Sequence, residues 1–324
     1  ELVAKAKRLG MSALALTDHG NLYGAIEFYK TCKANDIKPI IGVEAYIAVR
    51  SRLDKEPNID NKRYHLTLLA KNRAGYQNLI KLVSAANLEG YYYKPRMDKE
   101  LLAEHHEGII CLSGCLASEF SRALGNNDLA RAEVVIREHQ EIFGPDNYFL
   151  EIMHHPKIER QLEIKTMTIE LGHQLKIPLV ATHDSHYLEL DDAKAHDTLV
   201  AIQQNNFDDN KRFSAVGEDF SFISPDEAGK LFADIPEALE NTLRIAELCS
   251  IELELGKWAV VAEDASAAAV DDKRAAARGV AVRVRERIRN GVADDGVGSQ
   301  NLRAGRAGQG IRCRHQPHPR DLND

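Results

Sequence analysis

The chain has 324 residues, of which 44% are hydrophobic, and a formal net charge of −7 at pH 7. This composition indicates a globular chain that can bury a full core, and its length fits one barrel-sized domain with an appendage. The acidic balance excludes a global attraction to a polyanion, and the sequence contains no apolar run of 18 or more residues that would indicate membrane insertion.

The first segment, ELVAKAKRLG, has the pattern of an amphipathic helix that ends at Gly10. Neither an initiator Met nor an N-cap residue precedes it. We therefore expect the sequence to start inside a domain.

Short apolar segments that predict β-strands recur along the chain, and several run directly into metal-type ligands. These segments are SALALTDHG with Asp18 and His19, KPIIGVEAYI with Glu44, GIICLSGC with Cys115, NYFLEIMHH with Glu151 and His154, and LVATHDSHYL with Asp184 and His186. A further segment, RYHLTLLA, has His65 near the start of its strand instead. In parallel barrels reactive groups collect at the carboxyl ends of strands, so these ligands are expected to converge.

Helical patterns alternate with the strands over residues 22–35, 76–86, 129–142 and 158–175. Such alternation predicts parallel strands in a barrel or a doubly wound sheet, and the ligand-bearing strand ends favour the barrel. Beyond Tyr187 the pattern is mostly helical, with Ser224 as an N-cap followed by Pro225. We expect an α/β barrel over residues 1–190 and a helical annex over residues 191–257.

Composition changes abruptly after Trp258: no aromatic residue follows, and Ala, Arg, Gly and Val dominate. The Arg-rich stretch VRVRERIRN could bind nucleic acid, but it lacks aromatic residues and helical periodicity. A disordered tail over residues 258–324, or translation from a shifted reading frame that begins near Lys257, accounts better for this composition.

The spacing of the candidate ligands suggests how each acts. Asp184 and His186 are two residues apart, so in an extended chain they project to the same side. Asp18 and His19 are adjacent, so one would ligate while the other supports it, and His19 is the preferred ligand. Glu44 has two carboxylate oxygens that can bridge a pair of cations.

His65 and Cys115 would complete a set of nitrogen, oxygen and sulfur donors, which suits zinc, manganese or iron better than calcium or magnesium. Each has a structural alternative, because an isolated His in an apolar strand is often a core residue and a buried Cys behaves as a small hydrophobe. Glu151 could occupy a solvated strand position, and His154 could cap the turn before Pro156. Both are therefore secondary candidates.

Two further features bear on partners and compartment. The run Tyr91–Tyr93, followed by Lys94, Pro95 and Arg96, could stack on bases or form a packed loop. The chain has five cysteines, an odd number without the close, even spacing of disulfide-rich secreted domains. Reduced thiols and a cytoplasmic location are expected.

Long strings in this order, ALALTDHGNLYGAIEFYK, KPIIGVEAYIA, HLTLLAKNRAGYQNLIKLVSAA, IICLSGCLASE and ATHDSHYL, resemble the amino-terminal polymerase and histidinol phosphatase (PHP) domain of bacterial replicative DNA polymerase III alpha subunits. The resemblance covers residues 1–256 and implies a distorted seven-stranded βα barrel with a metal cluster at its strand ends. The metal ligands that it implies are His19, Glu44, His65, Cys115, Asp184 and His186.

Two departures from the family pattern limit what the resemblance implies. The family begins with a strand that carries an HxH pair, which would precede Glu1, so one metal site is expected to be incomplete. The polymerase palm with its catalytic aspartates would follow the annex, and nothing after Trp258 resembles it. We therefore expect a fragment that does not extend DNA by itself.

Three functions remain open from the sequence. The first is metal-dependent phosphoester hydrolysis, including 3'→5' exonuclease action on a DNA primer-template, with zinc or manganese as the ion and magnesium or iron as alternatives. The second is a metal-stabilised structural module that docks other replicase subunits, among them a proofreading exonuclease subunit. The third is a phosphatase of small metabolites. None of the three implies a membrane partner.

Overall fold

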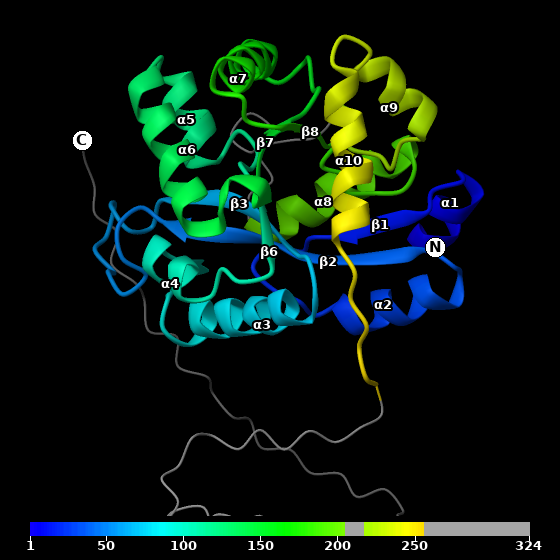
Figure 1. The fold of residues 1–324 in the computed structure, drawn as a ribbon, viewed down its shortest axis with the longest axis horizontal. Helices are drawn as coiled ribbons and strands as arrows, with labels where there is room; N and C mark the ends of the chain where they lie inside the picture. The colour runs from blue at the N-terminus through cyan, green and yellow to red at the C-terminus, as the bar shows by residue number, and fades with distance from the viewer. Residues whose placement is uncertain (205–216, 256–324) are drawn as a thin grey trace, which may run out of the picture. The chain divides into compact units, whose positions relative to one another are not determined.

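The computed structural model describes residues 1–204 and 217–255, which belong to one compact unit that spans residues 1–255 (Figure 1). The strands are β1 (Ala13–Leu16), β2 (Lys38–Ala48), β3 (Arg63–Ala70), β4 (Tyr91–Tyr92), β5 (Lys94–Met97), β6 (Ile109–Leu112), β7 (Tyr148–Ile152) and β8 (Leu179–Ala181). The α-helices are α1 (Leu2–Arg8), α2 (Ala25–Ala34), α3 (Arg73–Leu88), α4 (Lys99–Glu104), α5 (Glu119–Gly125), α6 (Leu129–Phe143), α7 (Gln161–Leu175), α8 (Ala193–Gln204), α9 (Pro225–Leu231) and α10 (Pro236–Leu248). Two 3₁₀ turns, η1 (Pro145–Asn147) and η2 (Leu190–Asp192), precede β7 and α8.

The strands form one sheet of mixed direction. Its order is β4-β5-β2-β3-β6-β7-β8, and β1 pairs with the first half of β2. The pairs β1 with β2, β2 with β5, β6 with β7 and β7 with β8 are parallel, whereas β3 is antiparallel to both β2 and β6. The expected α/β barrel is confirmed as a curled half-barrel, but the expectation of parallel strands is wrong at β3 and at the antiparallel pair of β4 and β5.

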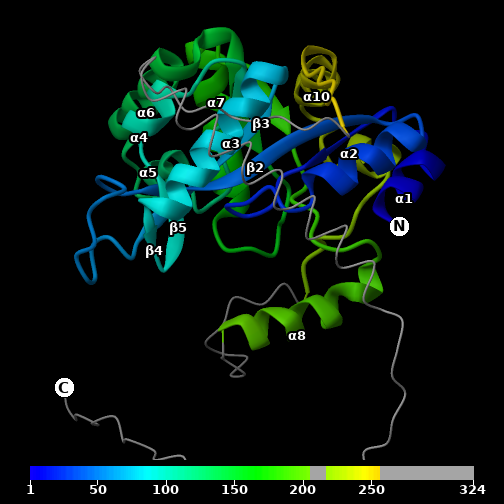
Figure 2. The ribbon, with the colours of Figure 1, turned by 90° about the horizontal axis from the view of Figure 1, so that it is seen from below.

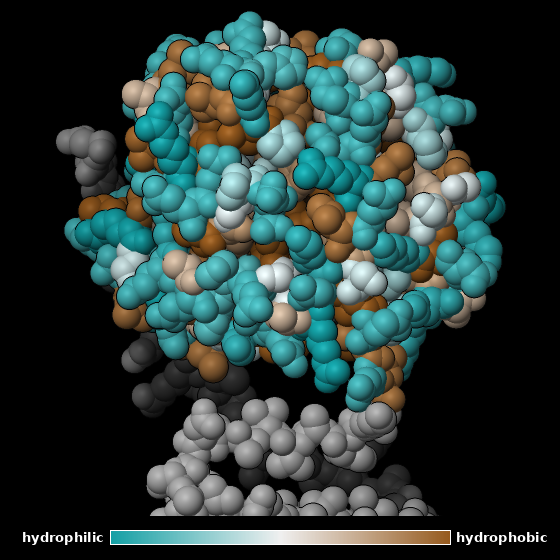
Figure 3. Space-filling model, viewed as in Figure 1, coloured by the Kyte–Doolittle hydropathy of each residue, from teal (hydrophilic) through white to brown (hydrophobic). Residues whose placement is uncertain are grey.

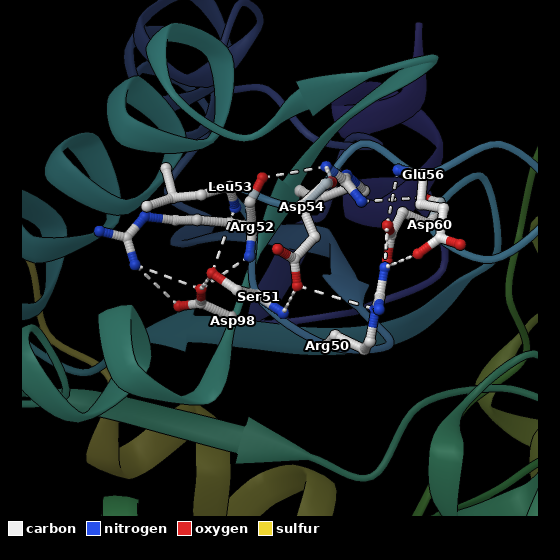
Figure 4. A network of polar contacts seen from close by, with 9 residues as sticks. Arg50, Ser51, Arg52, Leu53, Asp54, Glu56, Asp60 and Asp98 are labelled. Atoms are coloured by element: carbon white, nitrogen blue, oxygen red, sulfur yellow. Dashed lines mark hydrogen bonds and ion pairs between the residues drawn. The ribbon is translucent and has the colours of Figure 1, made fainter.

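The connection between β2 and β3 explains the reversed strand. A parallel neighbour needs a crossover, usually a helix, whereas an antiparallel neighbour can return through a loop. Residues 49–62 contain no helix and are instead held by ion pairs, including Arg50 to Asp60 at 2.6 Å and Arg52 to Asp98 at 3.0 Å (Figure 4). The chain therefore turns back, and β3 starts at the edge where β2 ends.

The outer face of the sheet packs against helices. Because side chains alternate between faces along a strand, Ile41, Val43, Ala45 and Ile47 of β2 share one side and join the largest apolar cluster of the protein. The same cluster contains buried residues of α2, α3, α5, α6 and α7, and Figure 1 shows α2 and α3 along one side of β2. The core that fixes the strands therefore lies outside the barrel.

The inner face changes character along its length. Near one end it is apolar and packs against Ile245 of α10, and this cluster contains Ile40, Leu69, Ile110, Leu112, Phe149 and Val180. Two or four residues further along the same strand faces lie Glu44, His65, Thr67 and Glu151. Reversal of β3 is what brings His65, at the start of its strand, to the same end as Glu44.

The predicted helices and annex are largely confirmed. Helices α2, α3, α6 and α7 correspond to the four helical patterns, and Ser224 caps α9 through a capping box with Glu227. Helix α10 contacts β8, whereas α8 lies away from the sheet in Figure 2. The domain boundary after residue 190 stays a prediction. The tail over residues 258–324, with its expected disorder and shifted frame, lies outside the described residues.

The surface agrees with this arrangement. Hydrophilic residues cover most of the face in Figure 3, and apolar residues are visible mainly between them. Among the described residues, no helix is long and apolar enough to cross a membrane.

Candidate metal centre

Three donor side chains meet at the polar end of the inner face. His19 follows β1, Glu44 belongs to β2 and His65 to β3, and their donor atoms all lie within 4.8 Å of one another. Glu44 Oε1 is 2.6 Å from His65 Nδ1, and Glu44 Oε2 is 3.5 Å from His19 Nδ1. Two imidazoles and one carboxylate in this arrangement are a donor set that fits a divalent metal ion.

The charge state of Glu44 suits a ligand. Burial raises its pKa, but the hydrogen bond with His65 and the nearby His19 and His186 outweigh burial, so the net shift of the pKa is downward. Glu44 is therefore ionised at neutral pH. One oxygen of Glu44 faces the imidazole of His65 and the other faces the imidazole of His19, so Glu44 joins these two side chains.

Cys115 joins the cluster from the loop between β6 and α5. Its Sγ lies 3.5 Å from His65 Nδ1 and 3.9 Å from Glu44 Oε1. The preceding Gly114 has φ +85, and a Cβ there would lie 2.7 Å from the carbonyl oxygen of His65. Burial, together with the carboxylates of Glu44 and Asp184, raises the pKa of the Cys115 thiol well above its usual value.

Asp184 and His186 also face this end of the barrel, although not for the reason that the sequence suggested. Strand β8 ends at Ala181, and Asp184 has φ 53, so the segment is bent and not extended. The two side chains nevertheless approach within 3.7 Å, from Asp184 Oδ1 to His186 Nδ1, and the His186 ring centroid is 5.9 Å from that of His19. Burial, followed by the Glu44 charge, raises the pKa of Asp184.

Glu151 is buried in the wall of the site, so a solvated strand position is excluded. Its carboxylate accepts hydrogen bonds from Thr67 Oγ1 at 3.2 Å, from the backbone N–H of Gly114 at 3.1 Å and from Thr182 Oγ1 at 2.8 Å. It thereby ties β3 to the loop that carries Cys115 and to the segment that carries Asp184. Burial raises the pKa of Glu151 to about 7.

The remaining candidates lie outside the three-donor cluster. The Asp18 carboxylate lies next to Gly24, which precedes α2, while the carbonyl of Asp18 accepts the N–H of Glu44. His154 packs edge-on against Phe232, with ring centroids 6.5 Å apart. Asp18 thus supports the site through its backbone, and His154 is part of the packing beneath it.

Four residues near the site are not among the ligands that the sequence predicted. Thr67 and Thr182 hold Glu151, and both could have been found by counting two residues along the strand from His65 and from Val180. His155 and His183 form a pair with ring centroids 5.2 Å apart, and both nitrogens of each ring are buried without a hydrogen-bond partner within the described ranges. Burial lowers the pKa of both imidazoles.

A cleft of about 870 Å³ opens onto the donor cluster. Its polar end contains His19, Glu44, Cys115, Glu151, Asp184 and His186, and its apolar end contains Ile40, Leu69 and Leu112 of the inner face. The donors are therefore reachable from solvent. The cleft is large enough to receive a substrate beside them.

Comparison with known proteins agrees with this geometry. Residues 1–155 match the family model of the PHP domain. The chain is also similar to proteins named DNA polymerase III subunit alpha: it is 45% identical over 254 residues to that of Treponema pallidum (strain Nichols), and 43% identical over 253 residues to that of Thermus aquaticus. These matches cover 78% and 75% of this chain but only 22% and 20% of the relatives' length. The expected resemblance is confirmed.

Proposed function

We propose that this PHP domain is a metal-dependent phosphoesterase within a bacterial replicative DNA polymerase alpha chain, and that it removes nucleotides from 3' ends of a DNA primer-template in the cytoplasm. The proposed ligands are His19, Glu44, His65, Cys115, Asp184 and His186, and the proposed ions are zinc or manganese. The observation that carries the proposal is the convergence of the His19, Glu44 and His65 donor atoms within 4.8 Å, beside a cleft that His19 and Glu44 line.

The residues of the chain have distinct tasks in this proposal. Divalent ions, when bound, would polarise a phosphoryl oxygen and lower the pKa of water. Glu44 holds the imidazoles of His19 and His65 in fixed orientations, because each of its oxygens faces one ring. Glu151 acts as a positioning residue, because it fixes the backbone next to Cys115 and, through Thr182, the chain before Asp184.

Elemental analysis of the purified chain by plasma mass spectrometry tests the proposal directly. We expect stoichiometric zinc or manganese in the wild type and its loss in His186→Ala. His173→Ala is the matched control, because His173 lies on α7 and is paired with Glu237 at a distance of 3.0 Å. A folded wild-type chain without metal, after incubation with either ion, would contradict the proposal.

A non-catalytic role is the alternative that the same site allows, since a metal cluster also stabilises an architecture that docks other replicase subunits. Asp184→Asn and His186→Ala separate the two roles when they are assayed in the full polymerase alpha chain. Loss of 3' end hydrolysis with unchanged folding and subunit binding supports catalysis. If the wild type does not hydrolyse DNA and the two variants lose subunit binding, the result supports docking. Preferential hydrolysis of small phosphomonoesters would instead indicate a metabolite phosphatase.

A further inference from the structure

Tyr46 lies at the edge of the metal centre and holds two cations beside its ring. The ring centroid of Tyr46 is 5.3 Å from that of His65 and 6.1 Å from that of His19. The Arg63 guanidinium carbon is 5.4 Å from the Tyr46 centroid, and the Lys94 ammonium nitrogen is 5.6 Å from it. The ring of Tyr46 therefore lies between two positive charges and the proposed ligands His19 and His65.

These two cations lack the partners that their neighbours have. Within the described residues, neither Arg63 nor Lys94 lies within 4.0 Å of a carboxylate oxygen, and the buried Nε of Arg63 has no hydrogen-bond partner. Arg50 and Arg52 on the preceding loop are by contrast saturated by acidic side chains, as Figure 4 shows. Arg63 and Lys94 are thus two cations beside the metal centre that no carboxylate of the described residues neutralises.

The hairpin that carries Lys94 also exposes aromatic rings. Tyr91 in β4 is 56% exposed, and Tyr93 at the turn between β4 and β5 is 67% exposed. Tyr92 between them is engaged, with the Arg96 guanidinium 5.4 Å from its ring. Tyr93 has φ 60, which is uncommon for a non-glycine residue. Such a backbone conformation persists where the surrounding structure fixes it, as at a tight turn.

We propose that Tyr46, Arg63 and Lys94, together with Tyr91 and Tyr93, form a binding track that leads a single nucleic-acid strand to the metal centre. In this track Arg63 and Lys94 bind phosphates of the strand, and the exposed tyrosine rings stack on its bases. Cations that follow a backbone and aromatic rings that stack on bases are the combination by which single strands are bound without sequence preference.

The track deepens the proposed function, on which it rests, because it selects one class of phosphate ester. A small phosphomonoester has a single phosphate, which the metal centre would take, and it offers no second anion to Arg63 and Lys94. A polynucleotide has further phosphates along its chain. The arrangement therefore favours the end of a nucleic-acid strand over a small metabolite.

Fluorescence anisotropy with a short 5'-labelled oligothymidylate tests the track on the full chain, in chelator so that binding is measured without hydrolysis. In Arg63→Gln/Lys94→Gln we expect binding to weaken about tenfold, and the slope of log affinity against log salt to fall by about 1.4, as for two lost phosphate contacts on a single strand. In Tyr91→Ala/Tyr93→Ala we expect a loss of about 30-fold or more, as for two lost base stacks, without a change of slope.

The matched control is Arg8→Gln/Lys30→Gln, which makes the same change in net charge at exposed positions of α1 and α2. We expect less than a twofold effect. Equal weakening in the control and in Arg63→Gln/Lys94→Gln would overturn the track, because binding would then follow net charge alone. Wild-type binding that does not depend on Tyr91 and Tyr93 would overturn the stacking.

A second measurement separates failure of the track from failure of the proposed function. Hydrolysis of bis(p-nitrophenyl) phosphate by the manganese-loaded wild-type chain reports on the metal centre alone. If that hydrolysis is present while Arg63→Gln/Lys94→Gln binds the oligonucleotide as the control does, the track is wrong and the phosphoesterase stands. If it is absent while the binding pattern is as expected, the track stands and the hydrolytic proposal is wrong.

Discussion

Replacing Glu151 by Gln tests the electrostatics of the site. Glu151 is 9% exposed, and burial raises its pKa from 4.5 to about 7. All three of its partners, Thr67, Gly114 and Thr182, donate hydrogen bonds to it. A Gln side chain keeps the shape and removes the charge, and the Thr182 hydroxyl can turn to accept a bond from the new amide.

The sign of the pH dependence follows from linkage. Between pH 4.5 and about 7 the folded chain holds a proton on Glu151 that the unfolded chain has released, so the free energy of unfolding falls as pH rises through this window. A difference of about 2.5 in pKa, at about 1.4 kcal/mol for each unit, amounts to about 3 kcal/mol. The Glu151 contribution is constant above this window and below it.

Urea unfolding in chelator at several pH values measures this pH dependence of the free energy of unfolding. We expect Glu151→Gln to be about as stable as the wild type near pH 4.5 and about 3 kcal/mol more stable at pH 8. Glu170→Gln on the exposed side of α7 is the control and should follow the wild type. The reasoning is refuted if the difference between Glu151→Gln and the wild type stays constant from pH 4.5 to 8. Added manganese should reduce the difference, because a nearby cation favours the carboxylate.

Three further predictions concern stability, and denaturant unfolding checks each. Arg96 is fully buried and donates to four backbone carbonyl groups, so Arg96→Met should cost about 3 kcal/mol or more, and a cost below about 1 kcal/mol would contradict this role. Gly75→Ala should destabilise by about 2 kcal/mol or more, because its Cβ would lie 1.8 Å from the Gly108 oxygen, whereas Gly229→Ala in α9 meets no atom within 4 Å and should be neutral or stabilising. Ser224→Ala should cost about 1 kcal/mol by removing the N-cap of α9, and an unchanged midpoint would show that this helix end is frayed in solution.

Much of the site could be predicted because ligand types follow short apolar runs. Asp18 and His19 after β1, and Asp184 and His186 after β8, were recognisable from a few adjacent letters. Cys115 was harder, since a buried Cys at a strand end is usually a packing residue. Its position 3.5 Å from His65 depends on the left-handed turn at Gly114.

The direction of β3 was the main error in the sequence interpretation, and a signal for it was present. No helical pattern lies between KPIIGVEAYIA and RYHLTLLA, and without a crossover helix the next strand can run antiparallel. His65 near the start of its strand, which was an exception among parallel strands, becomes regular once β3 is reversed. Glu151 was underestimated because nothing in its own strand shows that Thr67 and Thr182 surround it.

The sequence by itself determined the elements, the α/β class and the donor types, because apolar periodicity and capping act over a few residues and are visible locally. Tertiary structure alone decided which donors meet. Convergence of His19, Glu44 and His65 depends on strand direction and on the alternation of side chains across a curled sheet. His19 and His65 are 46 positions apart in the sequence (65 − 19), so no local pattern shows that they meet. The pairing state of the cations was likewise invisible in the sequence: Arg50 and Arg63 are the same residue type, but only the fold places acidic partners around the first.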